Sequence, residues 1–410
     1  MGVARGLGVL VGTVVILGLG AYGPATLLGP LPAASVTRVE LADPVAAVPP
    51  ALPETGSSAV TDSPTSATLA SAGGTEAVPM AGITKTITAL VVLDRHPISE
   101  DAPGATVPIT SADYLSYVDY QKAGKRTVSV FTADAWTERE MLQAMLLGSS
   151  NNHADTLARW AYGSVPEYVD AANAWLSEQG MSSTIVVDAT GLSEQSVGTA
   201  ADLARLSALA LDTPVIQAVL AEPVTGLPSR RGITNTTTYL PENGVTGISR
   251  SYTDAAGICL LFALDVVPEG STEPFRVYGA FLRQPDWAAL EAGVLALVES
   301  ARLGVTPLPA IAEGTPVVEF STEWGQTASG VAGLSPDRVR WGQTTPELTV
   351  DADPVTIAGA GTKVGTISVD DGSGDERTVS LKLGSSLHDP GVLWRLSHPF
   401  PVIGALLDSL

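Results

Sequence analysis

The protein has 410 residues, enough for two or three domains that each bury their own core. Its net charge of −21 argues against nucleic acid as a partner, because binding a phosphate backbone requires a basic face. The single cysteine, Cys259, excludes an internal disulfide. It stands in the apolar run Ile258 to Leu264, which predicts a small buried hydrophobic residue and argues against redox chemistry.

The N-terminus carries a long apolar stretch. Residues Leu7 to Leu31 are small or apolar and uncharged, and they follow Arg5. A run of about 25 uncharged residues is long enough to span a bilayer. We therefore expect residues 1–34 to be a signal anchor or a signal peptide, and we favour a retained membrane anchor. The rest of the chain would then lie on the extracytoplasmic side of the cell membrane, or be secreted if the segment is cleaved.

The next stretch, residues 35–66, is rich in Pro, Ala, Ser and Thr and predicts a linker and lead-in. A short strand is expected at Ala67 to Ala70, followed by a helix within Pro79 to Leu93. In this helix the apolar residues recur at spacings of three and four, which is the pattern of a packed helix. Gly82 and Lys85 are three residues apart, so they share one helical face.

A second helix is predicted from Thr137 to Leu147, because Thr137 and Glu140 form a capping box ahead of buried apolar positions. This helix leads into Ser149-Ser150-Asn151, directly before another helix. A third group follows, with a helix at Pro166 to Gln179, a turn at Thr190-Gly191 and a capped helix through Leu211. The segment Gly247-Ile248-Ser249-Arg250-Ser251-Tyr252-Thr253-Asp254-Ala255-Ala256-Gly257 then precedes an apolar strand.

These segments, in this order, resemble the serine-type D-alanyl-D-alanine carboxypeptidases, the low-molecular-mass penicillin-binding proteins. That family carries the motifs Ser-x-x-Lys, Ser-x-Asn and Lys-Thr-Gly. The resemblance covers most of residues 75–300. It implies an α+β fold in which a β-lactamase/penicillin-binding-protein-like domain, here residues 67–305, is followed by a small antiparallel β domain, with the N-terminal membrane segment ahead of both.

The resemblance also assigns roles to single residues. Lys85 matches the lysine that takes the proton of the serine nucleophile, but Gly82 stands at the nucleophile position and has no atom beyond Cα. Ser149 matches the serine of proton relay. Asn151 matches the asparagine that hydrogen-bonds the substrate backbone. The first motif is therefore degenerate and the second is intact.

The third motif is also degenerate, since Ser249-Arg250-Ser251 replaces Lys-Thr-Gly at the substrate-binding strand. Ser249 stands where the family's lysine supplies positive charge to the substrate carboxylate, and Ser251 where glycine lets the substrate backbone approach. Arg250 does not simply restore the charge, because adjacent strand residues project from opposite faces. It is expected to point away from the cleft unless the strand is bulged or its register slips.

After Leu303 the composition shifts to short Val, Thr and Ile runs between Gly, Asp, Ser and Pro, which predicts an antiparallel β domain over residues 312–386. Residues 387–410 form a C-terminal tail whose apolar side chains dock on the protein or lie at a membrane surface; packing on the protein is favoured because basic residues are few.

The remaining polar residues give no further site. His153 and Asp155 are two residues apart on one helix, so they face different ways, and no third ligand accompanies them. No serine stands in a Gly-x-Ser-x-Gly elbow, which argues against a Ser-His-Asp triad. We expect no metal and no cofactor.

Two functions from different classes remain. In the first, the protein is an extracytoplasmic pseudoenzyme that keeps the carboxypeptidase fold and binds a peptidoglycan stem peptide or a cell-wall protein. In the second, it is an active serine D-alanyl-D-alanine carboxypeptidase with an unorthodox nucleophile, which trims stem pentapeptides. Loss of the residue 82 hydroxyl favours the first.

Overall fold

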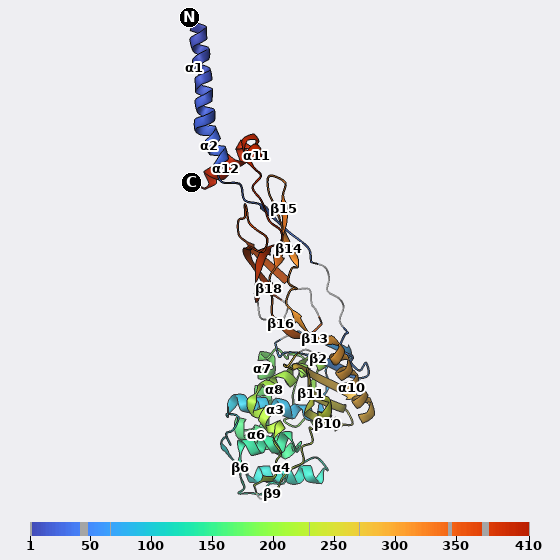
Figure 1. Cartoon of the computed structure of the whole chain (residues 1–410). Helices are drawn as coiled ribbons and strands as arrows, with labels where there is room; N and C mark the ends of the chain where they lie inside the picture. Colours follow the sequence, from blue (N-terminus) through green and yellow to red (C-terminus); the bar gives the residue numbers. More distant parts are fainter. Residues whose placement is uncertain are drawn as a thin grey trace. The chain divides into compact units, whose positions relative to one another are not determined.

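The computed structural model describes residues 2–41, 48–65, 67–228, 230–269, 271–342, 347–370 and 377–409. The chain divides into two compact units (Figure 1). The larger unit comprises Ala47–Pro307 and Val339–Gly342, and the other comprises Met1–Ala46, Leu308–Arg338 and Gln343–Leu410. Each unit is described by itself below.

The larger unit is built on a five-stranded antiparallel sheet with the order β10-β11-β12-β2-β3. Its strands are β10 (Val245–Thr253), β11 (Gly257–Val266), β12 (Phe275–Gln284), β2 (Ser57–Thr61) and β3 (Ala70–Gly73). Side chains alternate between the two faces, as the pleat requires. Leu261 and Ala280 join a core cluster on one face, and Leu260 and Phe281 join a second cluster on the other.

Helices cover both faces of this sheet. Helix α10 (Trp287–Gly304) packs through Leu290, Val294 and Leu297 on the face that carries Leu260 and Phe281. Helix α8 and the other helices, apart from the 3₁₀ turn η3, share the core cluster of the opposite face. Their bounds are η2 (Ala81–Ile83), α3 (Thr84–Arg95), α4 (Ser111–Lys122), α5 (Glu138–Leu146), α6 (Asn151–Tyr162), α7 (Val165–Glu178), α8 (Ala200–Asp212), α9 (Pro214–Ala221) and η3 (Pro241–Asn243). Short strand pairs join β4 (Val78–Pro79) to β7 (Val197–Gly198), β5 (Thr106–Pro108) to β6 (Ala135–Thr137), and β8 (Gly226–Leu227) to β9 (Arg230–Arg231).

Helix α3 is the central helix of the larger unit. All residues from Thr84 to Leu93 are buried, and α5, α6, α7 and α8 pack around it. The predicted helix therefore exists, but it begins with the 3₁₀ turn η2 at Ala81, where the backbone φ of Ala81 is +48°. The candidate site residue Lys85 therefore lies on the first turn of a helix that is buried among four other helices.

The prediction of a linker at residues 35–66 is wrong, because two strands form within this stretch. Strand β1 (Ser35–Arg38) pairs with a strand of the β-rich unit, and β2 pairs with β12 inside the five-stranded sheet. All five residues of β2 are buried. The partners β14 (Pro316–Ser321) and β12 lie more than 200 residues away in the sequence, so local composition gave no sign of these pairings, although β2 also pairs with the nearby β3. Residues 42–47 and 66 lie outside the described residues.

The β-rich unit contains a six-stranded antiparallel sheet, and one of its strands, β1, lies outside the predicted range of residues 312–386. The order is β1-β14-β15-β19-β18-β17, with Phe320, Ile367 and Leu381 fully buried in its core. The strands after β1 are β14 (Pro316–Ser321), β15 (Thr327–Ala332), β17 (Glu347–Ala352), β18 (Lys363–Asp370) and β19 (Arg377–Leu383). Strands β13 (Val305–Pro309) and β16 (Asp337–Trp341), most of whose residues belong to the larger unit, pair with each other.

Both ends of the chain belong to the β-rich unit. The N-terminal stretch forms α1 (Gly2–Leu17), a π-helical turn (Gly18–Tyr22) and α2 (Gly23–Leu27), and the C-terminal tail forms α11 (Val392–Ser397) and α12 (Pro399–Asp408). Helices α11 and α12 pack beside α2 (Figure 1). The Tyr22 hydroxyl donates to the carbonyl of Leu396 at 2.6 Å, and Val402 is fully buried, whereas Phe400 is 87% exposed. The tail thus docks on the protein through only part of its apolar surface.

Within the described ranges, no single helix is both long enough and apolar enough to cross a membrane. Helix α1 has 16 residues. Helices α8 and α9 meet the length and composition criteria only when taken together, and they meet at an angle of 86°.

Candidate active site

Four segments of the larger unit meet around one small cavity. The segments are the η2–α3 turn, the junction of α5 and α6, the stretch that holds Thr236 and Thr237, and strand β10. The cavity measures about 10 Å³, which is room for roughly one water molecule. Its lining includes the predicted site residues Gly82, Lys85, Ser149, Ser249 and Arg250, together with Thr86, Met145, Leu146, Thr236, Thr237 and Ile248.

Lys85 is buried at the start of α3, and its ammonium donates a hydrogen bond to the carbonyl of Thr190 at 2.8 Å. Burial lowers the pKa of Lys85 from 10.5 to about 8, because the charged amine loses hydration. The nearby carboxylates of Asp188 and Asp155 oppose this effect, and Arg126 adds to it. An amine with such a pKa is partly neutral near neutral pH and can accept a proton.

The turn that holds Lys85 is organised by Asp188. Its carboxylate accepts hydrogen bonds from the backbone N–H groups of Gly191, Leu192 and Ser193 at 2.9 to 3.1 Å. The Thr190 hydroxyl donates to the same carboxylate at 2.9 Å. These contacts fix the Thr190 carbonyl, which in turn fixes the lysine ammonium. Asp188 therefore both positions Lys85 and partly balances its charge.

Gly82 lies in η2, opposite strand β10. A Cβ built on Gly82 would lie 3.0 Å from the Cβ of Ser251, 3.6 Å from its Oγ and 3.7 Å from the Nζ of Lys85. The first of these distances is shorter than almost all contacts between real side chains, whereas the other two are ordinary. The position expected to carry the nucleophile thus faces Lys85 at a suitable distance, but Ser251 crowds it.

The second motif is held at the α5–α6 junction. Helix α5 starts with the predicted capping box: Glu140 accepts from the N–H of Thr137 at 2.7 Å, and the Thr137 hydroxyl accepts from the N–H of Glu140 at 3.2 Å. Ser149 follows with φ of +50°, a left-handed conformation that is uncommon outside glycine and often found at functional sites. Asn151 donates from both its backbone and its side-chain nitrogen to the carbonyl of Arg126, each at 3.0 Å. Its buried Oδ1 has no hydrogen-bond partner within the described residues.

The third motif lies on β10, where the pairing with β11 shifts between Gly247 and Ser249. Beyond this bulge the side chains alternate. Ser251 faces Gly82, whereas the guanidinium of Arg250 lies over the rings of Tyr239 and Trp287, 5.8 and 5.5 Å from their centroids. Tyr239 belongs to the core cluster on the α10 side of the sheet. The charge of Arg250 is thus engaged on that side, although part of the residue also lines the cavity.

A family model for D-alanyl-D-alanine carboxypeptidases matches residues 45–264, more than half of the chain. The chain belongs to this family. It is 32% identical over 215 residues to a D-alanyl-D-alanine endopeptidase of Pseudomonas aeruginosa, an alignment that covers 50% of this chain and 66% of that protein. A D-alanyl-D-alanine endopeptidase of Escherichia coli is 31% identical over 193 residues, covering 45% of this chain and 58% of that protein. In both cases the chain covers less than two thirds of the relative.

The fold is similar to a solved structure of penicillin binding protein 6B from Escherichia coli, with a TM-score of 0.58 and 15% identity over 84% of this chain and 96% of that one. At this identity the likeness concerns the fold alone. It confirms the predicted penicillin-binding-protein-like α+β fold with an additional antiparallel β domain.

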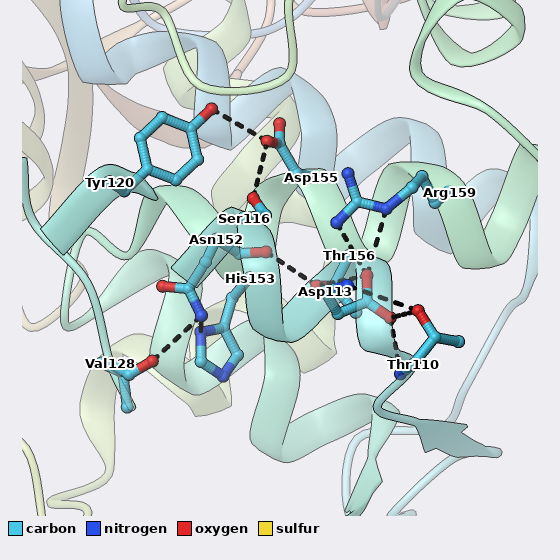
Figure 2. A network of polar contacts seen from close by, with 10 residues as sticks. All are labelled: Thr110, Asp113, Ser116, Tyr120, Val128, Asn152, His153, Asp155, Thr156 and Arg159. Atoms are coloured by element: carbon cyan, nitrogen blue, oxygen red, sulfur yellow. Dashed lines mark hydrogen bonds and ion pairs between the residues drawn. The ribbon is translucent and has the colours of Figure 1, made fainter. Parts of the chain in front are cut away.

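A network of polar contacts supports the carboxypeptidase-like site from α4 and α6 (Figure 2). Asp113 accepts from Arg159 at 2.7 Å and from the Thr110 hydroxyl at 2.6 Å. Asp155 accepts from the Tyr120 hydroxyl at 2.8 Å. Burial raises the pKa of Asp155, and this carboxylate also acts on Lys85. The network joins α4 to α6, the helix that carries Asn151 and Asp155.

His153, considered above as a metal ligand, belongs to the same network, where its Nδ1 lies 3.2 Å from the Nδ2 of Asn152 (Figure 2). Its Nδ1 lies 2.8 Å from the Ser150 hydroxyl, and its ring packs at 4.7 Å on Trp136. Among the residues that the structure describes, no group of three or more His, Cys, Asp or Glu side chains could hold a metal ion. His153 thus packs in the core beside the second motif.

Sequence reasoning missed several residues of the site. Asp188 and Arg126 act on the charge of Lys85, and Thr236 and Thr237 line the cavity. The stretch Asp188-Ala-Thr-Gly contained one usable signal, because an aspartate ahead of a Thr-Gly turn often accepts hydrogen bonds from the following backbone N–H groups. No local sequence signal marked Arg126, Thr236 or Thr237, because the tertiary fold alone brings them to the site.

Proposed function

We propose that this protein is a non-catalytic member of the D-alanyl-D-alanine carboxypeptidase family that acts by binding or scaffolding in peptidoglycan metabolism, outside the cytoplasm. The observation that carries the proposal is Gly82. Covalent catalysis in a Ser-x-x-Lys site requires a hydroxyl beside the lysine. Here the lysine is buried and poised, but the residue three positions earlier has no side chain.

The third motif supports the same proposal. Ser249 offers a neutral hydroxyl where the family's lysine would attract the substrate carboxylate. Arg250 does not replace that charge, since its guanidinium is stacked over Tyr239 and Trp287. The site would therefore lack both the nucleophile and the positive charge that binds the substrate carboxylate. These are separate contributions to catalysis.

The groups that remain are suited to hydrogen bonding. Lys85 and Ser149 line the cavity, and the buried Oδ1 of Asn151 can accept a hydrogen bond. Their polarity fits a peptidoglycan stem peptide, which carries backbone amides and a terminal carboxylate; a cell-wall protein that inserts a peptide segment is the other partner we consider. Because the cavity holds about 10 Å³, either ligand must widen the cleft between η2 and β10 as it enters.

An active serine carboxypeptidase is the second candidate, and one observation favours it. Several hydroxyls near Lys85 are buried without a hydrogen-bond partner in the described residues, among them those of Thr86 and Ser251. With Lys85 as base, such a hydroxyl could be acylated if the substrate reached it. Against this, the Ser251 Oγ is shielded from solvent, and neither hydroxyl occupies the position from which the family's serine attacks.

The experiment that separates the two candidates measures turnover and binding on the same sample. A soluble stem-pentapeptide analogue is incubated with the protein, released D-alanine is quantified, and binding is followed by calorimetry. We expect binding without D-alanine release. Asn151→Ala should weaken binding at least about tenfold, because a buried carbonyl that pairs with the ligand is removed, whereas Asn243→Ala, outside the cleft on η3, should not. Multiple turnovers by the parent protein would refute the non-catalytic function.

We further propose that the N-terminal segment anchors the protein in the cell membrane. Helix α1 exposes Leu10 and Val14, each to 63%, and residues 6–37 carry no charge. The sole cysteine, Cys259, is fully buried, so an introduced cysteine can carry an environment-sensitive dye. When vesicles are added, the emission maximum of the dye at Val14→Cys should shift to shorter wavelength. The emission maximum of the same dye at Leu334→Cys, in the β-rich unit, should not shift. Equal spectra at both positions would contradict the anchor.

A further inference from the structure

Two positions that face each other across the cleft have exchanged their usual occupants. Gly82 lacks the side chain that the first motif carries, and Ser251 has a side chain where the third motif has glycine. In the structure these are one another's neighbours: the Cβ of Ser251 lies 3.0 Å from the place that a Cβ on Gly82 would take. The two substitutions therefore concern the same small volume.

Neither side of this contact can yield easily. Ser251 is fixed by the pairing of β10 with β11, where it stands opposite the buried Cys259. Gly82 is fixed by η2, because a Cβ on Gly191 would lie only 1.7 Å from the carbonyl oxygen of Ala81, which shows how closely the two backbones already approach. A third neighbour, the Nζ of Lys85, is held by its hydrogen bond to Thr190. Adding atoms at position 82 must shift a strand or a turn, not the end of a flexible side chain.

We propose that Gly82 and Ser251 form a reciprocal pair in which only one of the two positions can carry a side chain, and that Ser251 is the residue that closes the cleft beside Lys85. The choice of ligand in this proposal rests on the proposed function, whereas the steric coupling between the two residues does not. The contact lies beside the cavity of about 10 Å³ that Gly82 and Lys85 line. The steric coupling implies that a serine at position 82 alone could not take a productive position, because Ser251 already occupies the volume beside it.

The coupling is tested with alanine, which adds only the Cβ. Gly82→Ala should lower the melting temperature by about 3 to 10 °C, as expected for an overpacked core of this size. In the Ser251→Gly background the same substitution should change the melting temperature by less than about 2 °C, or raise it, because alanine is preferred to glycine in a helical turn. Gly226→Ala is the matched control, since its Cβ would meet nothing within 4 Å.

Ser251→Ala distinguishes the Cβ from the hydroxyl. It keeps the crowding atom, so Gly82→Ala should remain as destabilising in that background as in the parent protein. If Gly82→Ala alone does not fold, then Gly82→Ala with Ser251→Gly must fold for the proposal to stand. An effect of Gly82→Ala that is the same in the parent protein and in the Ser251→Gly background would overturn it.

Ligand binding supplies a readout that stability alone would not move. The probe is diacetyl-L-lysyl-D-alanyl-D-alanine, with calorimetry on the full chain. Ser251→Gly should tighten binding at least about tenfold, whereas Ser251→Ala should leave it within about twofold of the parent. Equal affinity in Ser251→Gly and Ser251→Ala would overturn the role of Ser251 in closing the cleft. Coupled melting temperatures without binding by any variant would instead support the reciprocal pair and refute stem-peptide binding.

Discussion

Replacing Lys85 by methionine should change how the stability of the protein depends on pH. Burial lowers the pKa of Lys85 from 10.5 to about 8. A lowered lysine pKa means that the folded state binds the proton less tightly than the unfolded state. At about 1.4 kcal/mol per pKa unit, the charged ammonium then costs the folded state about 3 kcal/mol at pH 7. This cost is fully present below pH 8 and disappears as the pH rises toward 10.5.

The measurement compares the parent protein with Lys85→Met by urea unfolding at pH 7 and at pH 10. Other groups titrate in both proteins, so their effects cancel in the difference. Relative to Lys85→Met, the parent should gain about 2 to 3 kcal/mol of unfolding free energy between the two pH values. Lys122→Met, at an exposed position on α4, serves as the control and should show no such gain. A parent-minus-Lys85→Met difference that is the same at pH 7 and pH 10 would refute the buried, weakly basic amine.

Three further substitutions test the framework around the site by urea unfolding. Burial alone would raise the pKa of Asp113, but hydrogen bonds from Thr110 and Arg159 hold it below its usual value. Asp113→Asn should therefore lose about 2 to 4 kcal/mol at pH 7 and less as the pH falls toward the pKa of the folded carboxyl; a loss that does not depend on pH would contradict this. Thr137→Ala removes the helix cap of α5 and should cost about 1 kcal/mol, and a neutral result would show the cap to be dispensable. Gly191→Ala combines φ of +76° with a Cβ 1.7 Å from a carbonyl oxygen, so it should cost more than about 3 kcal/mol; a cost below about 1 kcal/mol would contradict the close approach of the two backbones.

Local signals in the sequence predicted the helices of the site well. The capping box at Thr137 and the apolar spacing after Gly82 each depend on residues within one or two turns. The order of the three motif segments also predicted the fold, because in the family that they resemble these segments surround one cleft. The same resemblance brought Lys85 and Ser149 to one cavity, although their mutual arrangement required the structure.

Long-range contacts are what the sequence could not supply. Strand β2 appeared as part of a linker although it pairs with the nearby β3, and its pairing with β12 joins segments more than 200 residues apart. The sequence displayed Gly82 and Ser251 as two separate defects, and only the structure brings their Cβ positions within 3.0 Å. Sequence patterns report periodicity and turn chemistry, whereas the distance between two segments is a property of packing.

The non-catalytic function requires that no residue of this cleft forms an acyl adduct. Intact-protein mass spectrometry tests this requirement after prolonged incubation with benzylpenicillin at pH 8.5, where Lys85 is largely neutral if its pKa is about 8. We predict an unchanged protein mass. A covalent adduct of one penicilloyl group, mapped by peptide sequencing to a hydroxyl in the cleft, would show that the site still acylates.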